Sequence, residues 1–95
     1  MKDPRKKPRE LTSSWPDQPS DDYVGEIARL FAINLREAIG DRSVRAISAE
    51  CNVSHATVLF ILSGEAYADL ASIARLEQGL NTNLWPALRL APAPV

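Results

Sequence analysis

Side chains that commonly act as nucleophiles, proton carriers or metal ligands are scarce in this sequence. It holds one cysteine, Cys51, and one histidine, His55, four positions apart. A thiol and an imidazole could pair as nucleophile and base, but no third group that would orient the imidazole is indicated. One Cys and one His cannot complete a zinc site, and the four scattered glycines form no phosphate-binding loop. We therefore expect no enzyme, no metal ion and no cofactor.

The size and composition are those of one small globular domain. The chain has 95 residues, of which 45% are hydrophobic and 24% charged. No apolar run approaches the roughly 20 residues that span a bilayer, and no signal-peptide pattern is present. A single cysteine suits a reducing compartment. We expect a cytoplasmic domain without a membrane or small-molecule partner.

The charge is divided unevenly along the chain. The first ten residues carry a net charge of +3, whereas residues 11–95 carry −4. Basic arms of this kind often contact nucleic acid, and the alternative is a solvated tail that keeps the chain soluble. The basic residues of the arm are Lys2, Arg5, Lys6, Lys7 and Arg9.

The pattern of the chain changes near residue 20. Residues 1–20 contain four prolines and no helical periodicity, which predicts a flexible or extended N-terminal arm. Residues 21–90 show apolar side chains at helical spacing and form the expected domain. Residues 91–95, with two prolines, are expected to fray.

The apolar periodicity predicts an all-α fold, a compact bundle of about five short helices. A first helix should end near Ile39, before Gly40, which suits a left-handed C-terminal residue. Three more helices should begin after the N-caps Ser43, Ser54 and Asp69, and one further turn could run through Leu90. Residues expected to face the core from the third and fourth helices are Val58, Ile61, Leu62, Leu70, Ile73, Ala74, Leu76 and Leu80.

The two tryptophans are expected to have different positions in the fold. Trp85, within Leu84-Trp85-Pro86, is expected to close the core as a buried plug. Trp15 lies outside the periodic region, and it either fastens the arm to the body or moves freely.

The second and third expected helices, joined by a tight turn at Cys51-Asn52-Val53, have the pattern of a helix-turn-helix, and residues 47–64 carry its motif. The residues are Ile47-Ser48, Asn52-Val53-Ser54 through the turn, Thr57-Val58, and a closing Gly64. This stretch resembles, without a gap, the motif of the lambda-repressor-like (Cro and XRE) family. The later Asp69–Glu77 and Leu84-Trp85-Pro86 are similar to actinobacterial and actinophage members, so that the resemblance covers about residues 24–88.

Several positions depart from the pattern of that family. Ser48 replaces a small apolar residue, which is tolerated if its hydroxyl bonds back to a helix carbonyl, and Asn52 replaces a glycine. Val44 stands where a polar phosphate contact is common. Leu59 and Phe60 lie at outward positions of the third helix that are polar in many relatives.

The third helix offers an outward stripe opposite its apolar side. Residues on such a stripe read base edges when the helix lies in the major groove. We expect base contacts from His55, Ala56, Leu59, Phe60 and Ser63. Phosphate contacts are expected from Arg42, Ser43, Arg45, Ser54 and Thr57, which lie near the starts of the second and third helices. A solvated histidine and plain surface arginines are the alternatives for His55 and for the two arginines.

The resemblance implies a sequence-specific double-stranded DNA-binding transcriptional repressor. Its type would be a phage or prophage immunity repressor or a Cro-like regulator that acts by occupying an operator. The sequence leaves open whether the chain binds the operator as a homodimer or as a monomer. The alternatives are an antitoxin-type autoregulator and a protein-interaction module that uses Leu59 and Phe60.

Overall fold

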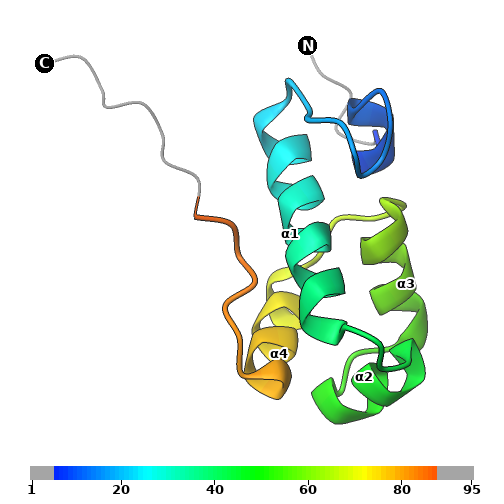
Figure 1. Ribbon diagram of the computed structural model, residues 1–95, viewed down its shortest axis with the longest axis vertical. Coiled ribbons are helices and arrows are strands. Elements are labelled where there is room, and N and C mark those ends of the chain that lie inside the picture. The colour runs from blue at the N-terminus through cyan, green and yellow to red at the C-terminus, as the bar shows by residue number, and fades with distance from the viewer. Residues whose placement is uncertain (1–5, 88–95) are drawn as a thin grey trace, which may run out of the picture.

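The computed structural model describes residues 6–87, and it is all-helical (Figure 1). Its α-helices are α1 (Tyr23–Ile39), α2 (Val44–Cys51), α3 (His55–Ser63) and α4 (Leu70–Leu80). A short 3-10 helix, η1 (Pro8–Leu11), precedes them, and no strand occurs within the described range. The predicted all-α class is confirmed. The expected turn through Leu90 lies partly outside the described residues, and residues 81–87 form no helix.

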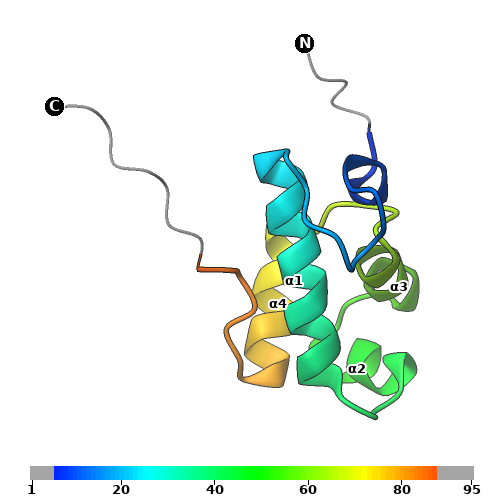
Figure 2. The same ribbon diagram turned by 45° about the horizontal axis from the view of Figure 1, so that its top comes forward.

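The long helix α1 runs through the middle of the fold. Figures 1 and 2 both show α4 on one side of α1 and α3 on the other. Helix α1 packs against α3 and η1, and α2 packs against α3 and α4. Helix α3 is therefore joined directly to α1, and α2 joins α3 to α4.

The helix ends are set by local hydrogen bonds, as the sequence predicts. The side chains of Ser43, Ser54 and Asp69 each accept a hydrogen bond from a backbone N–H three residues later. Such caps satisfy first-turn N–H groups that have no partner within the helix. Gly64 has a φ of 75° directly after α3, which a residue without a Cβ adopts at no steric cost.

The apolar core joins α1, α2, α3 and α4. Val58, Ile61 and Leu62 are buried, as expected for the inward side of α3. The buried core residues are Phe31, Leu35, Ile39, Ile47, Cys51, Val53, Val58, Ile61, Leu62, Leu76 and Leu84.

The inward side of α4 differs from the prediction. Leu70 is 82% exposed and Ala74 is exposed, whereas Ser72 and Leu76 are buried. The cap explains the orientation, because the Asp69 carboxylate binds both the N–H and the hydroxyl of Ser72 at 2.8 and 3.0 Å. Leu70 lies two positions before Ser72, about 200° around the helix, and so it faces solvent.

Trp85 is not the buried plug that the sequence predicts, because 55% of it is exposed. Leu84 and Pro86 are buried in its place. The Glu77 carboxylate accepts hydrogen bonds from the backbone N–H groups of Leu84 and Trp85, at 2.8 and 3.1 Å, and Asn34 donates to the Leu84 carbonyl. These bonds fix the backbone at a bend centred on Trp85, with the side chains of Leu84 and Pro86 buried on either side of it. Trp85 therefore remains about half exposed.

The boundary expected at residue 20 is also corrected, because residues 6–20 pack on the helical body. The backbone N–H of Arg9 donates to the carbonyl of Gly64 at 3.0 Å, and Pro8 is buried. Trp15 donates its indole N–H to the Leu62 carbonyl at 3.0 Å, which settles the open question in favour of an anchor. Within the described part, the N-terminal segment belongs to the folded domain.

Two glycines make this packing possible. A Cβ on Gly64 would lie 2.7 Å from the Trp15 ring, and a Cβ on Gly25 would lie 2.9 Å from the Cβ of Leu11. The segment is thus held by single side chains placed against bare backbone, rather than by a periodic apolar face. Arg29 adds a further contact, since it pairs with Glu26 and donates to the Pro16 carbonyl at 3.0 Å.

Candidate nucleic-acid interface

Helices α2 and α3 are joined by three residues, Asn52-Val53-Ser54, and the chain bends by 120° between them. Asn52 has a left-handed backbone with a φ of 56°. Ser48 binds Val53 twice, because its carbonyl accepts from the Val53 N–H and its hydroxyl donates to the Val53 carbonyl. Ser48 thus bonds to the carbonyl of the turn rather than to one within the helix. The turn is held by both side chain and backbone.

The described range contains no single helix that is long and apolar enough to cross a membrane. Helices α2 and α3 together have the length and apolar composition of a membrane span, but the chain bends by 120° between them, and buried core helices commonly have the same composition.

The outward side of α3 carries all five residues expected to contact bases. Leu59 and Phe60 are 42% and 50% exposed, although both are large and apolar. His55 is the first residue of α3. The exposed residues of this stripe are His55, Ala56, Leu59, Phe60 and Ser63. The structure therefore brings them together on one open surface, which we call the α3 stripe.

The hydroxyl groups expected to meet phosphates are already used within the helix caps. Ser43 accepts from the Ala46 N–H at 3.0 Å. Ser54 accepts from the Thr57 N–H at 3.1 Å and also donates to the Thr57 hydroxyl at 2.7 Å. Their first role is to begin α2 and α3 at fixed positions.

The two arginines near the start of α2 have different surroundings. Arg42 pairs with Glu50 at 3.1 Å, and it donates to the carbonyls of Ala38 and Ile39 at the end of α1. It braces α1 against α2. Arg45 is exposed and forms no ion pair within the described range. Arg45 is therefore the cation of this pair that is available to a phosphate.

The described cations of the arm lie beside the C-terminal end of α3, near η1 (Figure 1). Lys7 and Arg9 both pair with Glu65, at 2.7 and 2.6 Å, yet their side chains remain 43% and 46% exposed. The hydrogen bond from Lys7 holds the pKa of the Glu65 carboxyl below its ordinary value, and Arg9 acts in the same direction. Lys6 is exposed, and Lys2 and Arg5 lie outside the described residues.

Sequence reasoning missed Glu65 and the bracing role of Arg42. Glu65 pairs with residues more than fifty positions earlier in the chain, and Arg42 joins the end of α1 to the end of α2. The sequence contains one signal that the arm packs on the body, because a large apolar side chain such as Trp15 is rarely left in a free polar arm. That signal does not identify Glu65 as the carboxylate that pairs with Lys7 and Arg9.

Comparison of the chain with family models, with curated proteins and with solved structures found no match.

Proposed function

We propose that the chain binds double-stranded DNA sequence-specifically, with α2, its turn and α3 acting as a helix-turn-helix. The observation that carries this proposal is the α3 stripe, an exposed helix face held at a fixed angle to α2 by a three-residue turn. A recognition helix in the major groove needs such an unobstructed face. Helix α3 is the proposed recognition helix.

The chemistry of the α3 stripe suits the edges of base pairs. His55 stands at the N-terminal end of α3, where recognition helices contact bases, and its imidazole can donate to the guanine acceptors O6 and N7. Ala56 leaves room for close approach. Leu59 and Phe60 offer apolar contact to thymine methyl groups.

Cations near both ends of α3 support the proposal that this helix lies in the major groove. Arg45 lies on α2, which adjoins one end of α3, and the arm residues Lys6, Lys7 and Arg9 lie toward the other end (Figure 1). Because residues 11–95 carry −4, attraction to phosphates depends on where these few cations stand. They position the duplex, and the α3 stripe reads it.

The biological role that we propose follows from the resemblance of residues 47–64 to lambda-repressor-like proteins. The chain would act in the cytoplasm as a transcriptional repressor of phage or prophage type, by occupying an operator as a monomer or a homodimer. A second candidate, a protein-interaction module that uses Leu59 and Phe60 instead of binding DNA, is supported by the exposure of these two side chains. Binding to duplex DNA distinguishes the two.

His55→Ala tests the proposed reading of bases. We expect specific binding to weaken by about 1–3 kcal/mol, with little change on random duplex, because one base contact is lost. Fluorescence anisotropy at one fixed salt concentration measures both affinities. Gln78→Ala, at an exposed position of α4, is the control and should change neither. An equal loss on both duplexes would show that His55 contacts phosphate instead, and no loss on either would contradict the docking.

The salt dependence of binding tests the arm. Lys7 and Arg9 also hold the fold through Glu65, so we choose the triple substitution of Lys2, Arg5 and Lys6 to alanine. Each phosphate contact contributes about 0.9 to the slope of log affinity against log salt, and we expect the slope to fall by up to about 3. Arg75→Ala on α4, on the other side of α1 from α3, should leave the slope unchanged. A slope that the triple substitution also leaves unchanged would assign the arm to solubility alone.

A further inference from the structure

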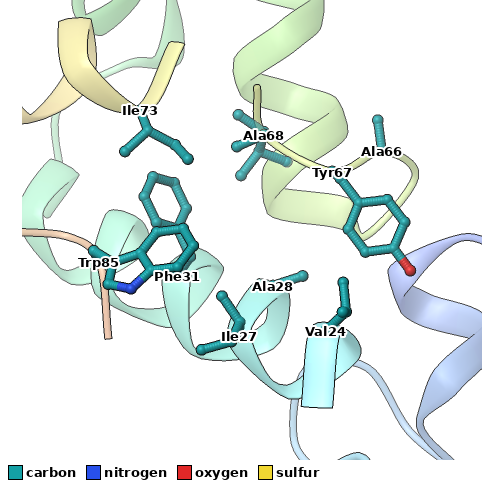
Figure 3. Close-up of a pocket in the computed structure, with 10 residues that line it drawn as sticks. Val24, Ile27, Ala28, Phe31, Ala66, Tyr67, Ala68, Ile73 and Trp85 are labelled. Carbon is teal, nitrogen blue, oxygen red and sulfur yellow. The ribbon is translucent and has the colours of Figure 1, made fainter. Parts of the chain in front are cut away.

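An open apolar pocket of about 210 Å³ lies between the first half of α1, the loop from α3 to α4, and the segment after α4 (Figure 3). Trp85 and Ile73 lie at one end, and Val24 and Tyr67 lie at the other. Phe31, which is buried, contributes to its inner wall. The described residues that line the pocket include no charged side chain, so the pocket suits an apolar group.

Most of the large apolar side chains that the described range exposes surround this pocket. Five of the seven lie there, and three of these five line it. Tyr23 lies four positions before the lining residue Ile27 on α1 and so shares a helix face with it. Leu70 lies three positions before the lining residue Ile73 on α4 and shares a face in the same way. We call this surface the apolar patch, and its members are Tyr23, Val24, Tyr67, Leu70 and Trp85.

The apolar patch is separate from the α3 stripe. The other two large exposed apolar side chains, Leu59 and Phe60, belong to that stripe. Helix α3 contributes to the pocket through Ile61, which is buried on its inward side. A molecule bound at the apolar patch therefore leaves the α3 stripe open.

The apolar patch has a projection beside its hollow. Leu70, the first residue of α4, is 82% exposed, whereas Trp85 forms part of the pocket wall. A two-fold rotation that seats Leu70 of one copy in the pocket of another also seats the second Leu70 in the first pocket. A face that carries both a projection and a hollow can therefore bind a second copy of itself.

We propose that a second copy of the chain binds the apolar patch, with Leu70 of each copy seated in the pocket of the other. This arrangement covers apolar surface that a monomer leaves in water, and apolar patches of this kind are typical of interaction sites. The inference goes beyond the proposed function, since it concerns self-association and holds whether or not the chain binds DNA.

The area of the apolar patch is close to what a stable dimer needs. Tyr23, Tyr67 and Trp85 are between 38% and 55% exposed. An aromatic side chain has about 150–250 Å² of surface, so the exposed parts of the three rings amount to roughly 300 Å². Leu70 and Val24 raise the apolar area to roughly 450 Å². Since homodimer interfaces are about 65% apolar, the whole interface would cover roughly 700 Å² on each copy, compared with about 800 Å² in typical stable interfaces.

Sedimentation velocity of the full chain over a range of concentrations tests the proposal. We expect a monomer–dimer equilibrium that persists at about 1 M salt, because apolar contacts are not screened. Leu70→Glu should weaken dimerisation at least about a hundredfold, since an unpaired carboxylate from each copy would enter an apolar contact. Ala71→Glu, about 100° further around α4 and also exposed, adds the same charge and should leave dimerisation unchanged.

Three results would overturn the proposal. The first is a native chain that stays monomeric up to about 1 mM, a concentration at which even weak specific contacts form. The second is association that disappears at high salt, which would assign it to the basic arm of one copy on the acidic body of another. The third is a dimer that Ala56→Glu disrupts and Leu70→Glu does not, which would assign the contact to the α3 stripe.

The two proposals fail separately. Leu70 is exposed, and an acidic residue in the first turn of α4 is compatible with the helix dipole, so we expect Leu70→Glu to keep the fold. Far-ultraviolet circular dichroism checks this. Dimerisation is measured without DNA, so a chain that binds no duplex can still dimerise through the apolar patch.

Discussion

Trp15→Ala is expected to lower the free energy of unfolding by about 3 kcal/mol, in line with other large-to-small aromatic substitutions. The change removes the ring that packs against Gly64 and the hydrogen bond to the Leu62 carbonyl, and so it releases the N-terminal segment from α3. For a domain of this size, 1 kcal/mol corresponds to roughly 4–8 °C in melting temperature. The loss is a large part of a typical total of about 5–15 kcal/mol.

Trp85→Ala is the matched control, because the residue type and the substitution are the same. Trp85 is half exposed, and we expect a loss of about 1 kcal/mol or less, as for other surface positions. Urea unfolding followed by circular dichroism compares the two variants without relying on tryptophan fluorescence. A larger loss for Trp85 than for Trp15 would reverse the account of how the N-terminal segment is anchored.

Ala56→Glu is expected to weaken binding to every duplex by more than about a hundredfold, because like charges brought together cost several kcal/mol. Ala56 is the second residue of α3 and lies on the α3 stripe, so that a carboxylate there would face the phosphates and base edges. An acidic residue in the first turn of a helix is compatible with its dipole, and we expect the fold to persist.

The chain offers a closely matched control for this substitution. Ala71 is also exposed and is also the second residue of its helix, α4. Ala71→Glu adds the same charge at the same helical position, away from α3, and should reduce binding only slightly through net charge. Gel-shift titrations of both variants at one salt concentration give the comparison. Equal binding by the two variants would exclude α3 as the DNA-facing helix.

The features that could be predicted from the sequence are those set by neighbours along the chain. The ends of α2, α3 and α4 follow from Ser43, Ser54 and Asp69, each of which bonds to a backbone N–H three residues later. Helical periodicity also identifies the buried and exposed sides of α3. The α3 stripe could therefore be predicted as a surface.

The features that could not be predicted depend on contacts between distant segments. Trp85 remains half exposed because Glu77 and Asn34 hold the backbone beside it. The N-terminal segment packs without periodicity, because Trp15 meets the bare backbone of Gly64 far along the chain. Hydrophobic patterning contains no information about such pairings.

Selection from a pool of random duplexes tests the central claim most directly. The native chain is incubated with the pool near physiological salt, and the bound duplexes are amplified and sequenced over several rounds. We predict enrichment of one short motif, bound at least about a thousandfold more tightly than random duplex. The Ala56→Glu variant, taken through the same rounds, should enrich nothing. Equal affinity of the native chain for all duplexes, or no binding at all, would contradict sequence-specific recognition by α3.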